Sequence, residues 1–325
     1  MIGIYFVLSL LATSTLSLLT LPTELPSPAL EEGKDFVVYL KGQQTSLQAT
    51  LKELSGADVV LIGENHDHKN GHKMELELLR GVSLQQPQLT FALEMFERDV
   101  QGVLDEYLKG FITESAFTQA SRPWPNYKED YRPLIEFCRE NSVPVVASNA
   151  PRRYVSIVSR KGKDALSALP KEAKRNLAPL PYDMKLPVGY EKSLDEVFGA
   201  HDEEVKKEGE KAANSTTTPT PPVTPSPAPP TNPNMPSVQN LKQAQALWDS
   251  TMADSILKAR KAGAKTVLHI NGGMHSDFGY GVADRLRRRD KSLRVKIVTI
   301  RESKNFPALP EGTPGEIADF VIVTK

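Results

Sequence analysis

The chain has 325 residues, of which 39% are hydrophobic and 25% are charged, a globular composition with enough apolar residues for a sizeable core. Forty basic and forty acidic residues give a formal net charge of +0, which excludes a global attraction to nucleic acid, so no nucleic-acid partner is predicted. The single cysteine, Cys138, excludes an intrachain disulfide, and its helical context PLIEFCREN predicts a small buried thiol.

Residues 1–30 are predicted to be a signal peptide or an N-terminal anchor, outside the fold. The stretch from Ile2 to Thr23 carries no charge and is followed by a proline-rich segment. No lysine or arginine precedes this stretch and no A-x-A cleavage pattern follows it, so an uncleaved membrane anchor competes with a cleaved signal. No cysteine follows the apolar run, which argues against a bacterial lipoprotein anchor. We expect an exported protein that is periplasmic, at the cell surface or membrane-anchored.

Short apolar runs then alternate with amphipathic stretches along the chain. The runs predict strands at 59–62, 90–93, 143–147, 266–270, 295–300 and 320–323. Their near-continuous hydrophobicity indicates burial on both faces. The stretches between them predict helices at 71–80, 99–109, 113–120, 131–141, 152–161, 238–262 and 281–289. This alternation is typical of an α/β domain, here a single domain over 31–325, with a mainly parallel sheet and helices on both faces.

One segment, residues 203–236, interrupts this pattern. A charged stretch, EEVKKEGEK, is followed by NSTTTPTPPVTPSPAPPTNPNMP, which has no residues to form a core. Because strand-forming sequence continues on both sides, we predict a disordered, partly polyproline insertion within the domain. A passive surface loop is favoured over a contact with a cell wall or a partner.

The polar residues that directly follow the predicted strands form the candidate site. Ligands of parallel sheets bind beyond the carboxyl ends of the strands, where these residues converge. Two of the strand ends continue into GxxH turns, Gly63 to His66 and Gly272 to His275, in which glycine permits close backbone approach. The full set is Gly63, Glu64, Asn65, His66, Glu94, Ser148, Asn149, Arg152, Asn271, Gly272, Gly273, His275 and Arg301.

The remaining histidines are interpreted as outside this set. His68 and His72 are spaced i, i+4, but the helix is expected to begin near Asn70, so shared metal ligation is not predicted, and both are taken as supporting or solvated residues. His201 lies beside the charged insertion and is expected to be solvated. His269 lies inside a strand and is expected to be a hydrogen-bonded core residue.

Two further stretches carry pocket-forming residue types. In QAQALWDSTMADSI, Gln245, Asp249 and Met252 share one helical face, which suits either a polar pocket wall or an ordinary core-edge helix. In RPWPNYKEDYRP, prolines bracket an aromatic segment containing Trp124 and can hold it against a flat ligand. The alternative is a surface loop pinned by Trp124.

The sequence resembles the ChaN-like haem-binding uptake proteins of the erythromycin-esterase and Tiki superfamily. The matching stretches are VLIGENHDH, FALEMFERDVQ, WPNYKEDYRPLIEFCRENSVPVVASNAPR, QALWDSTMADSI and HINGGMHSDFGYGVADRLRRR. This resemblance implies an exported protein that binds ferric haem, with Tyr131 of the Y-x-P pattern as first candidate ligand and Tyr127 as second. Arg132 or Arg122 would favour the phenolate form. His66, His275, Arg152 and Asp249 would complete the pocket, and arginine or histidine would pair with propionates.

The resemblance also implies partners. These are haem itself, a second subunit in a homodimer around haem, and a membrane-associated uptake machinery. This chain departs from the family pattern in lacking a lipidated cysteine, in having Ala283 where relatives often have proline, and in its insertion.

A metal-dependent hydrolase, a Tiki-like peptidase or esterase, is the alternative function, so whether the protein is an enzyme stays open. In this interpretation Glu64 or Glu94 activates a water molecule. A divalent metal ion would be held by His66, His275 and Glu94. The bare residues suit this chemistry, whereas haem binding rests on the family resemblance.

Overall fold

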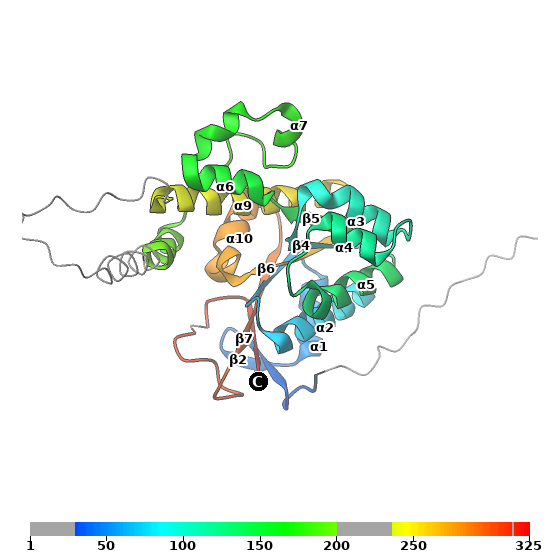
Figure 1. Ribbon diagram of the computed structural model, residues 1–325. Coiled ribbons are helices and arrows are strands. Elements are labelled where there is room, and N and C mark those ends of the chain that lie inside the picture. Colours follow the sequence, from blue (N-terminus) through cyan, green and yellow to red (C-terminus); the bar gives the residue numbers. More distant parts are fainter. Residues whose placement is uncertain (1–29, 200–235, 314) are drawn as a thin grey trace, which may run out of the picture.

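A computed structural model describes residues 30–199, 236–313 and 315–325 of the chain. Its centre is an eight-stranded sheet with the order β2-β1-β8-β7-β3-β6-β4-β5, in which β1 pairs antiparallel with β2 and β8 and all other pairs are parallel (Figure 1). The strands are β1 Phe36–Leu40, β2 Gln43–Thr45, β3 Val59–Glu64, β4 Leu89–Glu97, β5 Val145–Asn149, β6 Thr266–Gly272, β7 Val295–Glu302 and β8 Phe320–Thr324.

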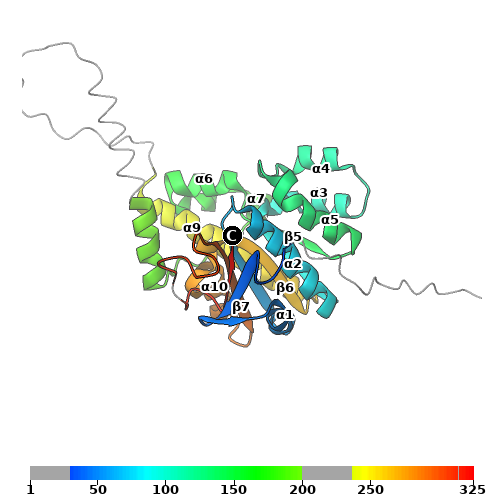
Figure 2. The ribbon, with the colours of Figure 1, turned by 90° about the horizontal axis from the view of Figure 1, so that it is seen from below.

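Helices cover both faces of this sheet, as the two views of Figures 1 and 2 show. One face carries α1 Leu47–Ser55, α2 Lys69–Gln85, α3 Gln101–Leu108, α4 Glu114–Ser121 and α5 Arg132–Glu140, and the other carries α9 Val238–Lys261 and α10 Gly281–Arg289. The helix α6 Arg152–Lys161 packs against α9, and the short helix α7 Lys171–Lys174 lies beyond α6 in the view of Figure 1. None of the helices in the described part of the chain combines the length and apolar character needed to cross a membrane.

Alternation along the strands explains why the sheet is buried on both sides. In β3, Val60 and Ile62 pack into the core under α2, whereas Val59 and Leu61 pack into the core under α9 and α10. Successive side chains of a strand point to opposite faces, so an unbroken apolar run fills two cores at once. The hydrophobic runs thus place the parallel strands in the centre of the sheet.

The predicted α/β class is confirmed, and each of the six predicted strands coincides with a strand of the sheet. The short antiparallel pair β1 and β2 was not predicted, and it extends the sheet at the edge formed by β8. All but the last residue of the insertion predicted at 203–236 lies outside the described residues, as does nearly all of the predicted signal peptide or anchor. Their character stays a prediction.

Candidate functional site

Residues that follow four parallel strands meet in a cavity of about 250 Å³ beyond the strand ends. His66 follows β3, Glu94 lies in β4, Asn149 ends β5, and His275 follows β6. Trp124, Trp248 and Arg152 complete much of the wall. The fold therefore brings strand-end residues together in one cavity, as predicted. One histidine from each GxxH turn lies in this cavity.

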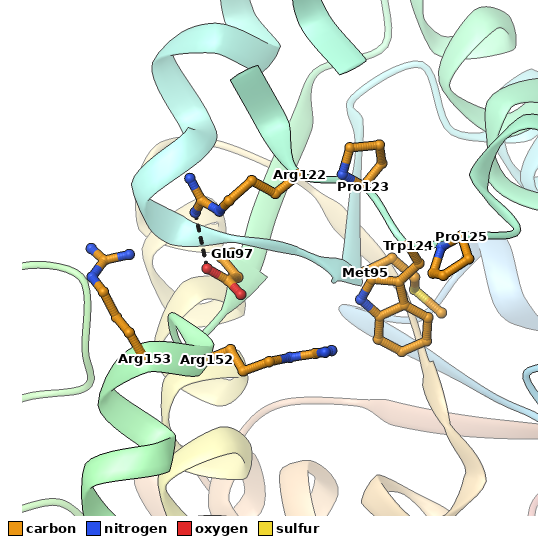
Figure 3. Close-up of a pocket in the computed structure, with 8 residues that line it drawn as sticks. All are labelled: Met95, Glu97, Arg122, Pro123, Trp124, Pro125, Arg152 and Arg153. Carbon is orange, nitrogen blue, oxygen red and sulfur yellow. Dashed lines mark hydrogen bonds and ion pairs between the residues drawn. The ribbon is translucent and has the colours of Figure 1, made fainter. Parts of the chain in front are cut away.

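A larger pocket of about 720 Å³ adjoins this cavity and shares Glu97, Trp124 and Arg152 with it. Figure 3 shows Arg152 extending from the first turn of α6 along a pocket that Trp124 and Met95 also line. Arg122 is held by Glu97 and Asp99. By contrast, the Arg152 guanidinium makes no hydrogen bond or ion pair with any residue in the described ranges. It is therefore available to an anionic ligand in this pocket.

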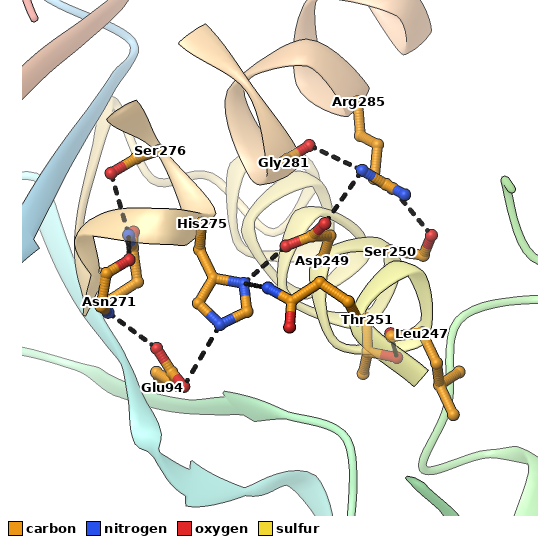
Figure 4. A network of polar contacts seen from close by, with 12 residues as sticks. Glu94, Leu247, Asp249, Ser250, Thr251, Asn271, His275, Ser276, Gly281 and Arg285 are labelled. Carbon is orange, nitrogen blue, oxygen red and sulfur yellow. Dashed lines mark hydrogen bonds and ion pairs between the residues drawn. The ribbon is translucent and has the colours of Figure 1, made fainter. Parts of the chain in front are cut away.

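A buried relay of charged groups forms one wall of the cavity (Figure 4). His275 Nδ1 donates to Asp249 Oδ1 at 2.6 Å, and His275 Nε2 lies 3.5 Å from Glu94 Oε1. The second oxygen of Asp249 accepts from Arg285 at 3.1 Å and from the Tyr190 hydroxyl at 3.1 Å. Asp249 is fully buried in α9 and contacts His275, and the α9 residue among those that line the cavity is Trp248.

Electrostatics keep this relay charged near neutral pH. Burial disfavours the imidazolium of His275, but attraction by Glu94 and the hydrogen bond to Asp249 outweigh it and raise its pKa to about 10. Burial also disfavours ionised Glu94, yet attraction by His275 lowers its pKa to about 2. The cavity therefore presents an imidazolium beside a carboxylate. Such a pair can orient a polar ligand or transfer a proton.

His66, from the other GxxH turn, lines the cavity with a 43% exposed side chain. Its Nδ1 donates to Glu64 Oε1 at 2.6 Å, and the hydroxyl of Tyr131 donates to the same oxygen at 2.7 Å. Gly272 makes room for this ring, because a Cβ there would lie 2.9 Å from His66 Nε2. The Glu64 carboxylate thus holds the proton on Nδ1, which leaves Nε2 as the nitrogen that can bind a ligand.

The two candidate tyrosines lie behind the pocket wall. Tyr131 is 0% exposed and Tyr127 is 4% exposed. The ring centroid of Trp124 lies 6.0 Å from that of Tyr131. A π-helical turn, Tyr127–Tyr131, precedes α5 and buries both rings. Their role as haem ligands stays a prediction.

Arg132 favours the phenolate of Tyr127, but its effect on the pKa is smaller than that of burial. Arg132 pairs with Glu114, and Arg122 pairs with Glu97 and Asp99. Burial raises the pKa of Tyr131, and the nearby Glu64 carboxylate raises it further. Burial likewise raises the pKa of Tyr127. Both phenols are therefore protonated in this conformation.

Of the two roles expected for His72, supporting or solvated, the solvated one is wrong, because this residue is buried against Glu64. It is 4% exposed, and its Nδ1 lies 3.3 Å from Glu64 Oε2 and 3.2 Å from Glu75 Oε2. Glu75 was not predicted to be a site residue, although its i, i+3 spacing from His72 on a helix indicates that the two side chains are neighbours. His68 is also buried, with Nε2 2.7 Å from Thr324 Oγ1.

These side chains change the picture of metal ligation. Among the described His, Cys, Asp and Glu residues, the three whose ligand atoms all lie within 4.8 Å of one another are Glu64, His72 and Glu75. His66, Glu94 and His275 line one cavity but do not form such a set. His269 is a fully buried core residue bonded to Ser148 and Asn271, as predicted, whereas His201 lies outside the described residues.

The fold and this site define an α/β protein with paired GxxH turns and buried glutamates at the ends of parallel strands. The family model described as "Haem-binding uptake, Tiki superfamily, ChaN" matches residues 50–286, well over half of the chain. The protein belongs to this family, which confirms the relationship that the sequence motifs indicate.

Known relatives are distant in sequence. The solved structure titled "Cofacial heme binding to ChaN of Campylobacter jejuni" is 17% identical, with a TM-score of 0.62, over 91% of this chain and 99% of that chain. "Protein RETICULATA-RELATED 5, chloroplastic" of Arabidopsis thaliana is 23% identical over 83% of this chain, which spans only 34% of that relative. An erythromycin esterase in its open conformation is 13% identical, with a TM-score of 0.43, over 85% of this chain and 78% of that chain.

Proposed function

We propose that the protein binds haem in the pocket between Trp124 and Arg152. Membership of the haem-binding uptake family supports the choice of ligand. The observation that carries the proposal is that Trp124 and Arg152 line one pocket, that Arg152 has no hydrogen-bond or ion-pair partner among the described residues, and that the exposed His66 lines the adjoining cavity. Its volume of about 720 Å³ falls in the range of roughly 300–1,000 Å³ that ligand pockets occupy.

These residues fit the chemistry of haem. Trp124 offers an aromatic face to a flat macrocycle, and the Arg152 guanidinium suits a propionate. His66 Nε2 is the nitrogen through which the iron would be bound, because Nδ1 is held by Glu64 at 2.6 Å. Tyr131 is the ligand that the family implies, but its side chain is fully buried and its hydroxyl donates to Glu64. We therefore propose His66 ahead of Tyr131 as the iron ligand.

A titration of the purified, EDTA-treated protein with ferric haemin, followed by absorbance, tests this proposal. We expect a saturable, equimolar shift of the Soret band that weakens in Arg152→Ala and changes form in His66→Ala. His68→Ala is the matched control, since His68 contacts Thr324 away from the pocket. The absence of a saturable shift would refute haem binding itself.

The same spectra assign the ligand. A tyrosinate charge-transfer band in the wild type that disappears in Tyr131→Phe or Tyr127→Phe would refute ligation by His66. Unchanged spectra in both tyrosine variants, with a changed spectrum in His66→Ala, are the result that our assignment predicts.

A hydrolase is the second candidate, favoured by the relay of Asp249, His275 and Glu94 at the cavity wall. An imidazolium held by a buried carboxylate at 2.6 Å can act as a general acid in hydrolysis. If this function is right, Glu94→Gln should abolish hydrolysis of an ester or peptide substrate without weakening haem binding. Full activity of Glu94→Gln in the presence of added divalent metal would count against it.

We also propose that the protein is exported and acts in haem or iron uptake together with membrane-associated machinery, as a homodimer around haem. The uncharged stretch from Ile2 to Thr23 supports export or anchoring. Cell fractionation with and without residues 1–30 tests localisation. Light scattering with and without haemin tests the dimer: a mass that stays monomeric in both would refute it.

A further inference from the structure

We propose that Glu64, His72 and Glu75 bind a first-row divalent cation inside the domain, behind the haem pocket. His72 and Glu75 lie one turn apart in the first half of α2, and Glu64 is the last residue of β3. All three side chains are at least 96% buried. This site contacts the haem pocket through Glu64, which also holds His66, but the inference does not rest on haem binding.

The hydrogen bonds of His72 show which nitrogen faces the carboxylates as a potential ligand. His72 Nε2 lies 3.0 Å from the backbone oxygen of His66, which can only accept, so Nε2 carries a proton. In the neutral imidazole, the lone pair of Nδ1 then points at Glu64 Oε2 and Glu75 Oε2. Two carboxylate oxygens at this nitrogen require a positive species there, which is either a proton on Nδ1, since Glu64 and Glu75 raise the pKa of His72 to about 11, or a metal ion that replaces this proton.

The distances favour a metal ion as this species. His72 Nδ1 is 3.3 Å from Glu64 Oε2 and 3.2 Å from Glu75 Oε2. Charge-assisted N–H···O bonds are shorter, about 2.7–2.9 Å, and a single Nδ1–H cannot donate well to two oxygens. Tetrahedral ligands at about 2.0–2.1 Å from a metal lie about 3.3 Å from one another. The observed separations match those of ligands around an ion.

An unpartnered oxygen at this position provides independent support. Glu64 Oε2, which lies 3.3 Å from His72 Nδ1, is buried and has no hydrogen-bond partner among the described residues, and the same holds for the second oxygen of Glu75, Oε1. Glu64 Oε1, by contrast, accepts from His66 at 2.6 Å and from Tyr131 at 2.7 Å. A buried carboxylate oxygen left unpaired is costly, and most such atoms find a partner. Glu64 is thus arranged to hold His66 with one oxygen and a cation with the other.

Charge and ligand type indicate the class of cation. Two carboxylates and a neutral imidazole carry two negative charges, which one divalent ion neutralises. One imidazole nitrogen with carboxylate oxygens suits zinc, manganese or iron, whereas calcium and magnesium prefer oxygen-only sites. The proton on Nε2, fixed by the His66 carbonyl, is the outer contact that metal-bound histidines usually make.

Metal analysis of the full chain tests this inference. The protein is produced in separate cultures supplemented with Zn²⁺, Mn²⁺ or Fe²⁺, purified without haem, and assayed by mass spectrometry of the elements. We expect one equivalent of one of these metals after dialysis. Glu75→Gln should lose it, with an affinity decrease larger than the roughly 10- to 100-fold caused by removing an outer contact. Glu77→Gln, a buried glutamate on the same helix, is the matched control and should keep the metal.

Each result has a definite meaning. Wild-type protein with less than a tenth of an equivalent of metal from all three cultures would overturn the proposal, whatever the variants do. A Glu75→Gln protein that folds, by circular dichroism, and still binds one equivalent would also overturn it. If metal-free Glu75→Gln still binds haemin, the metal site and haem binding are independent. If the wild-type protein does not bind haemin at all, the proposed function fails, but the metal content measured here still decides this inference.

Discussion

Replacement of Arg285 by methionine should destabilise the protein severely, because Arg285 is the buried counter-charge of the relay. Its side chain is 1% exposed and donates to Asp249 at 3.1 Å, to Ser250 at 3.0 Å, and to the backbone oxygens of Gly281 at 3.0 Å and Asp183 at 3.2 Å. Removing one partner of a buried ion pair costs about 3–5 kcal/mol, since the remaining charge stays desolvated. That is a large part of the roughly 5–15 kcal/mol by which domains are stable.

Urea unfolding followed by circular dichroism measures this cost. Arg288→Met is the control, since Arg288 lies on the same helix, is 27% exposed and pairs with Asp183 and Asp284. We expect a loss of only about 0–1 kcal/mol in this control. A loss in Arg285→Met that is no larger than in Arg288→Met would refute the argument that the relay depends on a buried counter-charge.

Three further outcomes are expected. Gly272→Ala should change the spectrum of bound haemin while the fold is kept, because a Cβ would lie 2.9 Å from His66 Nε2 and the ring can move; an unchanged spectrum would place the iron elsewhere. The pKa of His275 is raised from 6.5 to about 10, so its contribution to unfolding free energy, on the order of a few kcal/mol, is full below pH about 6.5 and lost as pH rises to about 10. The free energy of unfolding in urea should therefore differ less between pH 7 and pH 10 in His275→Gln than in the wild-type protein. Cys138 is fully buried and burial raises its pKa, so thiol reagents should label it in urea but not in the native protein.

The sheet was predictable because its signal is local. Val59 to Ile62 and the five similar runs are buried on both faces, and this requirement leaves an unbroken apolar stretch in the sequence. The strand β2 lacks that signal, because Gln43 and Gln44 are exposed and Thr45 is only partly buried. The strand β1 does carry an apolar run, FVVYL, in which Phe36, Val37 and Val38 are buried, so this strand was readable from the sequence and was missed. The alignment of β1 with β8 is a contact between opposite ends of the chain, which no short window contains.

The site was predictable as far as it follows from strand ends and no further. Because parallel strands end at one edge, His66, Glu94 and His275 had to lie close together once the strands were located. The positions of the strand ends do not determine how deeply each side chain is buried. Tyr131 lies behind the wall because a π-helical turn before α5 aims it at Glu64. His72 faces Glu64 because α2 begins at Lys69, directly after the loop that follows β3. A shift of one residue in that helix would turn His72 by about 100°, away from the carboxylate, so the cluster depends on a helix boundary that sequence patterns locate only to within a few residues.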